Sequence, residues 1–289
     1  MNGILLIDKP ADWTSMDVCA KLRGALREKK VGHAGTLDPM ATGLLTVFLG
    51  RATRAVEFAE ADEKTYAAAL RLGLVTDTQD MTGTVLERHE VDITNEQLDA
   101  VLEQFRGPIL QIPPMYSALK VQGKKLYELA RKGREVPRDP RPVTIFDLER
   151  TGRLGDEVFL RVRCSKGTYI RALCHDIGMT LGCGGAMSAL RRTAAGRFSL
   201  DQANSLDAVL SAAAAGEAEG LLLPVDALFS SLPALTLTPG QTKAIRSGGW
   251  FSTSAAAGDW RLYDQAGEFL ALGRSAEGSL RAVKSFYEV

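Results

Sequence analysis

The stretch Gly35-Thr36-Leu37-Asp38-Pro39-Met40-Ala41-Thr42-Gly43 places a single carboxylate among small, turn-forming and hydroxyl-bearing residues. The glycine at each end permits backbone angles that residues with a Cβ avoid, and Pro39 fixes its own φ. We therefore expect Asp38 to lie on a stiff, exposed loop, where a carboxylate can act as a nucleophile or a general base. An isolated Asp-Pro pair is more often an ordinary turn, so the surrounding sequence must decide between these interpretations.

Outward from this loop, predicted strands and helices are interspersed without regular βαβ spacing and without the glycines of a dinucleotide site. A buried strand at residues 4–7 is followed by a helix that Thr14 opens, with Asp17 three residues later in a capping-box pattern. The other strands are expected at residues 44–49, 65–72, 143–148 and 158–164, and the other helices at residues 94–105, 169–181 and 211–220. This irregular order predicts an α+β fold rather than a doubly wound sheet.

The character of the sequence changes at about Leu232. Short strand-like segments then alternate with Gly/Ser turns, at residues 234–237, 260–263, 269–272 and 280–283. This pattern predicts a small β-barrel appended to the main domain. We therefore expect one domain over residues 1–231 and a second over residues 232–289.

The overall charge is balanced, but its distribution is not. Thirty-five basic residues match 35 acidic ones in a chain of 289 residues that is 45% hydrophobic. Residues 199–226 hold five acids and no Lys or Arg. A basic segment holds eight cations against three acids: Lys120, Lys124, Lys125, Arg131, Lys132, Arg134, Arg138 and Arg141. A phosphate-binding face and a merely solvated run of charges explain this segment equally well.

Cysteine and histidine usage gives no sign of a metal site. The four cysteines show no C-x-x-C spacing and the three histidines are scattered, so we expect no zinc site. The first residues lack the basic region of a signal peptide, and no apolar run approaches the roughly 20 residues that span a bilayer. We therefore expect a cytoplasmic protein that does not contact membranes.

Two further clusters could carry chemistry together with Asp38. Tyr66 follows Lys64 at the start of a predicted strand, where a lone tyrosine is more often packed in the core. Arg171 falls in the first turn of a predicted helix, where a cation opposes the helix dipole unless an acid pairs with it. A planar guanidinium can hold such a carboxylate with two parallel hydrogen bonds.

Together these clusters resemble the TruB type of pseudouridine synthase, which isomerises uridine 55 in the T-loop of transfer RNA. The resemblance runs in order along most of the chain: Lys9-Pro10, Thr14-Ser15, Val31-Gly32-His33-Ala34-Gly35-Thr36-Leu37-Asp38-Pro39, Lys64-x-Tyr66, Leu72-Gly73, Thr76-Asp77-Thr78, Pro113-Pro114-x-Tyr116-Ser117-Ala118, Lys166-Gly167-Thr168-Tyr169-Ile170-Arg171, Asp176-Ile177-Gly178 and Leu190-Arg191-Arg192-Thr193. The segment after Leu232 is similar to the PUA module, with fewer matching residues.

The resemblance implies a catalytic role for Asp38, which Arg171 pairs with and keeps ionised, and for Tyr66, which stacks on the base and takes part in proton transfer at C5. It implies that His33 fills space left by flipped nucleotides and that Leu190 lies beside the uracil. The other residues implied to bind substrate are Gly35, Thr36, Leu37, Lys64 (near phosphate) and Tyr169. The RNA backbone contacts we expect are Lys9, Lys120, Lys124, Arg131 and Lys132.

The resemblance also implies a fold and a set of partners. The fold is a mixed, largely antiparallel central sheet with flanking helices, followed by a PUA-like barrel. The partner is the T-arm stem-loop of tRNA, bound by a monomer that needs neither cofactor nor an obligatory protein partner. Two positions depart from the family pattern: Asp12 stands where glycine is common, and Ala186 where His or an aromatic residue is common.

Two other functions compete with this interpretation. An aspartyl-phosphate hydrolase also uses a loop aspartate, but it would want a second acid two residues on, where this chain has Met40. No glycine-rich run ends in Gly-Lys-Ser/Thr, which excludes a P-loop. A non-catalytic RNA-binding or tRNA-folding protein would need only the barrel and the basic segment.

Overall fold

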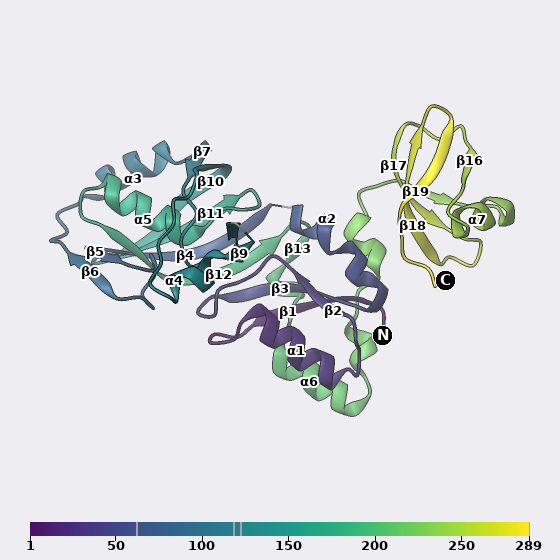
Figure 1. Ribbon diagram of the computed structural model, residues 1–289, viewed down its shortest axis with the longest axis horizontal. Coiled ribbons are helices and arrows are strands. Elements are labelled where there is room, and N and C mark those ends of the chain that lie inside the picture. The colour runs from purple at the N-terminus through teal and green to yellow at the C-terminus, as the bar shows by residue number, and fades with distance from the viewer. Residues whose placement is uncertain (62, 118, 122, 289) are drawn as a thin grey trace.

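The computed structural model describes residues 1–61, 63–117, 119–121 and 123–288. Figure 1 shows a large lobe built on a long twisted sheet and a smaller C-terminal lobe. Some residues of the sequence analysis fall outside the description: Ala118 of the resemblance, and the side chains of Lys120 and Lys125 in the basic segment. Within the described residues, no helix is both long and apolar enough to cross a membrane.

Ten strands form the central sheet, in the order β14-β1-β3-β12-β4-β11-β10-β7, with β2 paired to β3 and β13 to β12. Most pairs are antiparallel, whereas β1–β14 and β3–β12 are parallel. The predicted α+β fold with a mixed, largely antiparallel sheet is therefore confirmed. The strands are β1 (Gly3–Lys9), β2 (Val31–Ala34), β3 (Thr42–Leu49), β4 (Lys64–Leu72), β7 (Gly107–Gln111), β10 (Arg141–Leu154), β11 (Glu157–Cys164), β12 (Gly185–Ala195), β13 (Phe198–Ser199) and β14 (Asn204–Ser205).

Strand β12 lies at the centre of this sheet and was not predicted from the sequence. Its sequence lacks a regular in–out alternation because the strand carries register shifts at Met187/Ala189 and Arg192/Ala194. Between these bulges, Leu190 lies opposite Ala68 and Arg192 lies opposite Tyr66. The bulged strand thus brings a leucine and an arginine next to the predicted catalytic tyrosine.

The predicted helix caps are confirmed at two positions. Thr14 and Thr94 each form a capping box, at the start of α1 (Ser15–Ala25) and α3 (Asn95–Gln104). The helix expected at residues 211–220 instead begins after its Ser205 cap and ends before Gly216, whose φ is +77°. The remaining helices are α2 (Val56–Ala61), α4 (Leu126–Ala130), α5 (Ile170–Thr180), α6 (Leu206–Ala215) and α7 (Pro239–Arg246).

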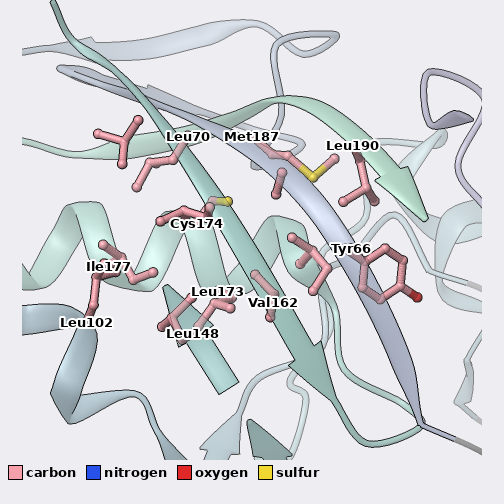
Figure 2. Packing of buried hydrophobic residues seen from close by; sticks show 14 of the residues in the cluster. Tyr66, Leu70, Leu102, Leu148, Val162, Leu173, Cys174, Ile177, Met187 and Leu190 are labelled. Atoms are coloured by element: carbon pink, nitrogen blue, oxygen red, sulfur yellow. The ribbon is translucent and has the colours of Figure 1, made fainter. Parts of the chain in front are cut away.

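One apolar core positions the site. In Figure 2, Leu173 and Ile177 of α5 pack toward β4 and β11, which contribute Leu70 and Val162. Tyr66 and Leu190 lie at one end of the same cluster. Two small hairpins stand outside the central sheet: β5 (Leu74–Thr76) with β6 (Val85–Arg88), and β8 (Lys120–Val121) with β9 (Lys124–Lys125).

The C-terminal lobe is a curled five-stranded sheet with α7 beside it (Figure 1). Its strand order is β15-β17-β18-β19-β16, so β15 and β16 remain edges of a half-barrel. All four strands expected here are present, whereas β16 and α7 were not predicted. The strands are β15 (Ala234–Thr236), β16 (Trp250–Ser252), β17 (Gly258–Tyr263), β18 (Phe269–Ala276) and β19 (Ser279–Ser285).

Aromatic rings join the two lobes. Phe229, just before the C-terminal sheet, lies 5.3 Å from the Phe58 ring of α2 and 6.0–6.1 Å from the rings of Phe286 and Phe269 (centroid distances). Around this cluster, Lys284 Nζ lies 2.6 Å from Glu57 Oε1. The C-terminal sheet is therefore packed against α2 rather than tethered by a free linker.

We expect Phe229→Ala to lower the free energy of unfolding by about 3–5 kcal/mol, because it leaves a cavity between three rings. Urea unfolding of the whole chain measures this change. Phe146→Ala is the matched control, since the Phe146 side chain is 45% exposed on the central sheet. Equal losses in the two variants would contradict a packed interface at Phe229.

Candidate active site

The Asp38 loop connects β2 to β3 and is fixed at several points. Gly35 and Gly43 have φ of +73° and +97°, and a Cβ on Gly43 would lie 2.3 Å from the backbone oxygen of Arg192. The buried Leu37 donates its N–H to Ser15 Oγ at 2.9 Å. The stiff loop is confirmed, but its carboxylate is only partly exposed: the Asp38 side chain is 34% accessible.

Arg171 grips this carboxylate with two contacts. Its Nε lies 2.9 Å from Asp38 Oδ2, and its Nη2 donates to Oδ1 at 3.2 Å. The guanidinium is 5% exposed and also donates to the carbonyls of Tyr116 (2.8 Å) and Thr78 (3.2 Å). The pairing expected for an arginine in the first turn of α5 is confirmed. This pair joins residues 133 positions apart.

A second carboxylate, Asp80, completes this cluster and was not predicted as a site residue. Asp80 is buried, and its Oδ2 lies 3.6 Å from Arg171 Nη1. Its other oxygen accepts hydrogen bonds from Thr78 Oγ1 (2.8 Å) and the Thr82 N–H (2.9 Å). The dense run of Thr and Asp after β5 was the available signal, because such residues bond to their own turn.

Burial raises the pKa of Asp38 above its ordinary value. The Arg171 charge lowers the pKa of Asp38, whereas the Asp80 charge raises it further. The resemblance implied that Arg171 keeps the aspartate ionised; Arg171 does act in that direction, but burial and Asp80 outweigh it. The main effect of the Arg171 guanidinium is to fix the orientation of the Asp38 carboxylate through its two contacts.

Tyr66 is both a core residue and a neighbour of this cluster. Its ring belongs to the core under α5, so the ordinary packing interpretation holds. Burial raises the pKa of Tyr66, and the Arg192 guanidinium opposes that shift. The charge of Asp38 also raises the pKa of Tyr66, which places the two side chains in one electrostatic environment.

The other predicted substrate-binding residues surround the loop in different ways. His33 of β2 is half-buried, and within the described part of the chain its Nδ1 has no hydrogen-bond partner. Burial lowers the pKa of His33. Lys64 is buried and donates to the carbonyl of Glu60 at 2.8 Å. The Tyr169 N–H donates to Gln111 Oε1 at 2.8 Å, which fixes the start of α5.

One predicted RNA contact is wrong. Lys9 is fully buried, and its Nζ donates to the carbonyls of Trp13 (2.6 Å), Pro10 (2.8 Å) and Pro39 (3.2 Å). An ammonium enclosed by three carbonyls cannot reach a phosphate at the surface. The ammonium instead holds Pro39, the residue that follows Asp38.

The two departures from the family pattern have different surroundings. Asp12 has φ of +64°, a conformation that glycine adopts without strain and aspartate tolerates, and its N–H donates to the carbonyl of Pro39 at 2.9 Å. Ala186 is fully buried in β12. Asp12 therefore supports the Asp38 loop, whereas Ala186 belongs to the core.

The basic segment lies apart from the carboxylate cluster in the sequence. Lys124, Arg131 and Lys132 are exposed, and the Arg131 guanidinium lies 5.5 Å from the centre of the Tyr127 ring. Among the described residues, no group of three or more His, Cys, Asp or Glu side chains could hold a metal ion.

We expect Lys9→Met to change how stability depends on pH. Burial lowers the pKa of Lys9 to about 8, against an ordinary value of 10.5. Between pH 8 and 10.5 the unfolded chain binds a proton that the folded chain lacks, so the wild-type free energy of unfolding rises relative to the variant by about 1.4 kcal/mol per pH unit. Below pH 8 the difference is constant, because both states are protonated.

Urea unfolding from pH 7 to 10.5 tests this expectation. The exposed Lys21→Met is the control, and its difference from the wild type stays flat across this range. A flat difference for Lys9→Met would contradict the buried, perturbed amine.

Two protein-family models match the chain. Residues 23–170 match the family model described as TruB family pseudouridylate synthase (N terminal domain). Residues 171–230 match the tRNA pseudouridylate synthase B C-terminal domain.

Relatives are similar over nearly the whole chain. The protein named tRNA pseudouridine synthase B from Azoarcus sp. (strain BH72) is 48% identical over 97% of this chain and 93% of its own length. The protein of the same name from Dechloromonas aromatica (strain RCB) is 46% identical over the same shares. A chain in the crystal structure of a Cbf5-Nop10-Gar1 complex is 26% identical, with a TM-score of 0.76 over 99% of this chain and 85% of that chain.

Proposed function

Because the chain belongs to the TruB family of pseudouridylate synthases, we propose that it converts uridine 55 in the T-loop of tRNA to pseudouridine, with Asp38 as the catalytic side chain. The observation that carries this proposal is the contact between Asp38 and Arg171. It presents one aimed, partly accessible carboxylate on a rigid loop beside Tyr66. A protein that only bound RNA phosphates would need no buried arginine paired with an aspartate.

The reaction breaks the N1–C1′ bond, turns the uracil and joins C5 to C1′, without net redox change or hydrolysis. The routes considered for the family have the aspartate attack C1′, attack C6, or take a sugar proton. Each needs one ionised carboxylate held close to the nucleotide, which is the arrangement that Arg171 supports. No cofactor enters any of these routes.

The target nucleotide must leave its stacked position before it reaches Asp38, which costs a few kcal/mol. Stacking on an aromatic ring recovers about 1–3 kcal/mol per base, and we assign this contact to Tyr66, whose pKa the charge of Asp38 raises. His33 fills space vacated by flipped nucleotides, and Leu190 provides an apolar contact to the uracil. Gly35, Thr36, Leu37, Lys64 and Tyr169 complete the substrate-binding residues.

Residues 1–231 form the catalytic domain and residues 232–289 a PUA-like RNA-binding domain. The C-terminal sheet that begins at Ala234 supports this division. The exposed cations Lys124, Arg131 and Lys132 approach the backbone of the T-arm. The enzyme acts in the cytoplasm as a monomer without an obligatory protein partner.

Release of tritium from a T-arm RNA labelled at uridine C5 tests the catalytic role of Asp38. We expect release by the wild type and none by Asp38→Asn, because the amide cannot act as an anion. Both proteins should bind the RNA, since the phosphate contacts remain.

Asp201→Asn is the matched control, because Asp201 is exposed in a short 3-10 turn and should be fully active. Release by Asp38→Asn at the wild-type rate would remove Asp38 from its assigned role. Absence of release by the wild type would reject the proposed activity itself.

The double variant Arg131→Gln, Lys132→Gln tests the basic segment. We expect weaker RNA binding and a slope of log K against log salt that is less steep by about 0.7–0.9 for each phosphate that the variant no longer neutralises. Arg88→Gln, which removes an exposed cation from β6, is the control and should leave the slope unchanged. An unchanged slope in the double variant would show that Arg131 and Lys132 do not neutralise RNA phosphates.

A further inference from the structure

Gln111 is a buried polar side chain to which the proposed function gives no role. It is the last residue of β7 and is 2% exposed. Both polar atoms of its carboxamide bond to the backbone of Tyr169. The Tyr169 N–H donates to Gln111 Oε1 at 2.8 Å, and Gln111 Nε2 donates to the Tyr169 carbonyl at 3.0 Å. Because a buried amide is normally conserved in its hydrogen bonds, these two partners indicate what Gln111 holds.

Helix α5 receives a cap from outside its own sequence. Tyr169 stands at its N-cap, and the Tyr169 side chain makes no capping hydrogen bond. In a capping box, a Gln or Glu three residues later accepts the N–H of the N-cap, but α5 has Ala172 there. Helix α3 has the usual arrangement, in which Gln97 accepts the Thr94 N–H at 2.8 Å. Gln111 therefore supplies to α5, across 58 positions of the chain, the bond that Gln97 supplies to α3.

The start of α5 determines where Arg171 lies. Arg171 is the second residue of the helix, and its guanidinium contacts the two oxygens of Asp38 at 2.9 and 3.2 Å. The Tyr169 carbonyl, which Gln111 holds, also accepts the first hydrogen bond of the helix, from the Leu173 N–H at 3.1 Å. A shift of Tyr169 would therefore move the backbone that carries Arg171.

The chain that follows Gln111 contacts the same guanidinium. The carbonyl of Tyr116 accepts a hydrogen bond from Arg171 Nη2 at 2.8 Å. Pro113 and Pro114 lie between Gln111 and Tyr116, and each fixes its own φ. Gln111 thus links the backbone that carries Arg171 to the segment that provides one of the acceptors for its guanidinium.

We propose that Gln111 is a positioning residue, which sets the start of α5 so that the Arg171 guanidinium reaches both oxygens of Asp38. It acts through the backbone of Tyr169. Loss of its carboxamide removes both hydrogen bonds to Tyr169 and lets the first turn of α5 shift. The effect on the rate of isomerisation rests on the proposed function, whereas the effect on the contact between Asp38 and Arg171 does not.

Carbon-13 NMR titration of the Asp38 carboxyl group in the RNA-free protein tests the contact itself. Burial and the Asp80 charge raise the pKa of Asp38, whereas the charges of Arg171 and Lys9 lower it. Gln111→Met removes both hydrogen bonds at a similar side-chain volume. We expect the pKa of Asp38 to be higher in this variant than in the wild type, because Arg171 no longer holds both carboxylate oxygens.

Single-turnover isomerisation of T-arm RNA, with saturating enzyme in excess, tests the consequence for the reaction. We expect Gln111→Met to be slower than the wild type on the order of 10²-fold, the loss that a displacement of about 1 Å can cause. Its Kd for the RNA should be unchanged. The acid limb of its pH–rate profile should move to higher pH, because Asp38 reacts as an anion. Partial unfolding would not mimic this result, since only folded, RNA-bound enzyme contributes to the rate constant.

Gln97→Met is the matched control, because it removes the same kind of hydrogen bond from α3. It should leave the pKa of Asp38 and the rate unchanged. In an Arg171→Lys background, Gln111→Met should cause no further loss of rate, because an ammonium does not hold two carboxylate oxygens as a guanidinium does.

Three results would overturn the inference: an unchanged pKa of Asp38 in Gln111→Met, additive losses of rate in the cycle with Arg171→Lys, or loss of RNA binding by Gln111→Met. The last result would show that Gln111 supports the fold as a whole. Absence of isomerisation by the wild type would instead reject the proposed function, and the titration of Asp38 would still decide the role of Gln111.

Discussion

The contact between Asp38 and Arg171 is the interaction on which the site depends. It joins the loop after β2 to the first turn of α5. The Asp38 carboxylate compensates a cation that the positive end of the helix dipole would otherwise disfavour, and the carboxylate itself gains a fixed direction. Because Asp80 shares the same guanidinium, the site holds two acids around one buried base.

Around this pair, the Asp38 loop is held by groups that would ordinarily face solvent. The Lys9 ammonium donates to the carbonyl of Pro39, and the Arg192 guanidinium to that of Gly35. Two buried cations thus replace the hydrogen bonds that a loop usually makes with water. The result is a loop with little conformational freedom around Asp38.

Local patterns predicted much of the fold. Capping boxes identified the starts of α1 and α3, and the alternation of residues in β11 identified that strand. Strand β12 was missed because its bulges break the alternation on which such predictions rely. Helix α6 was placed five residues late because its alanine-rich second half dominated the pattern, whereas the Ser205 cap decides its start.

The site was predicted less completely, for a physical reason. Asp38, Arg171 and Tyr66 stand in distinctive local contexts, whereas the burial of Asp80 and Arg192 depends on contacts between distant segments. Lys9 was assigned to the surface because a lysine at a strand end usually extends into water. The Lys9 ammonium is enclosed because the carbonyls of Trp13 and Pro39 lie against it. No local sequence pattern indicates these contacts.

The paired bulges of β12 have a consequence for variation in chain length. Between them, four consecutive residues from Ala189 to Arg192 face fixed partners on β4. Loss or gain of one residue there would turn Leu190 and Arg192 to the opposite side of the sheet, since side chains alternate along a strand. Homologous chains can therefore exchange side chains in this segment more readily than they can lengthen or shorten it.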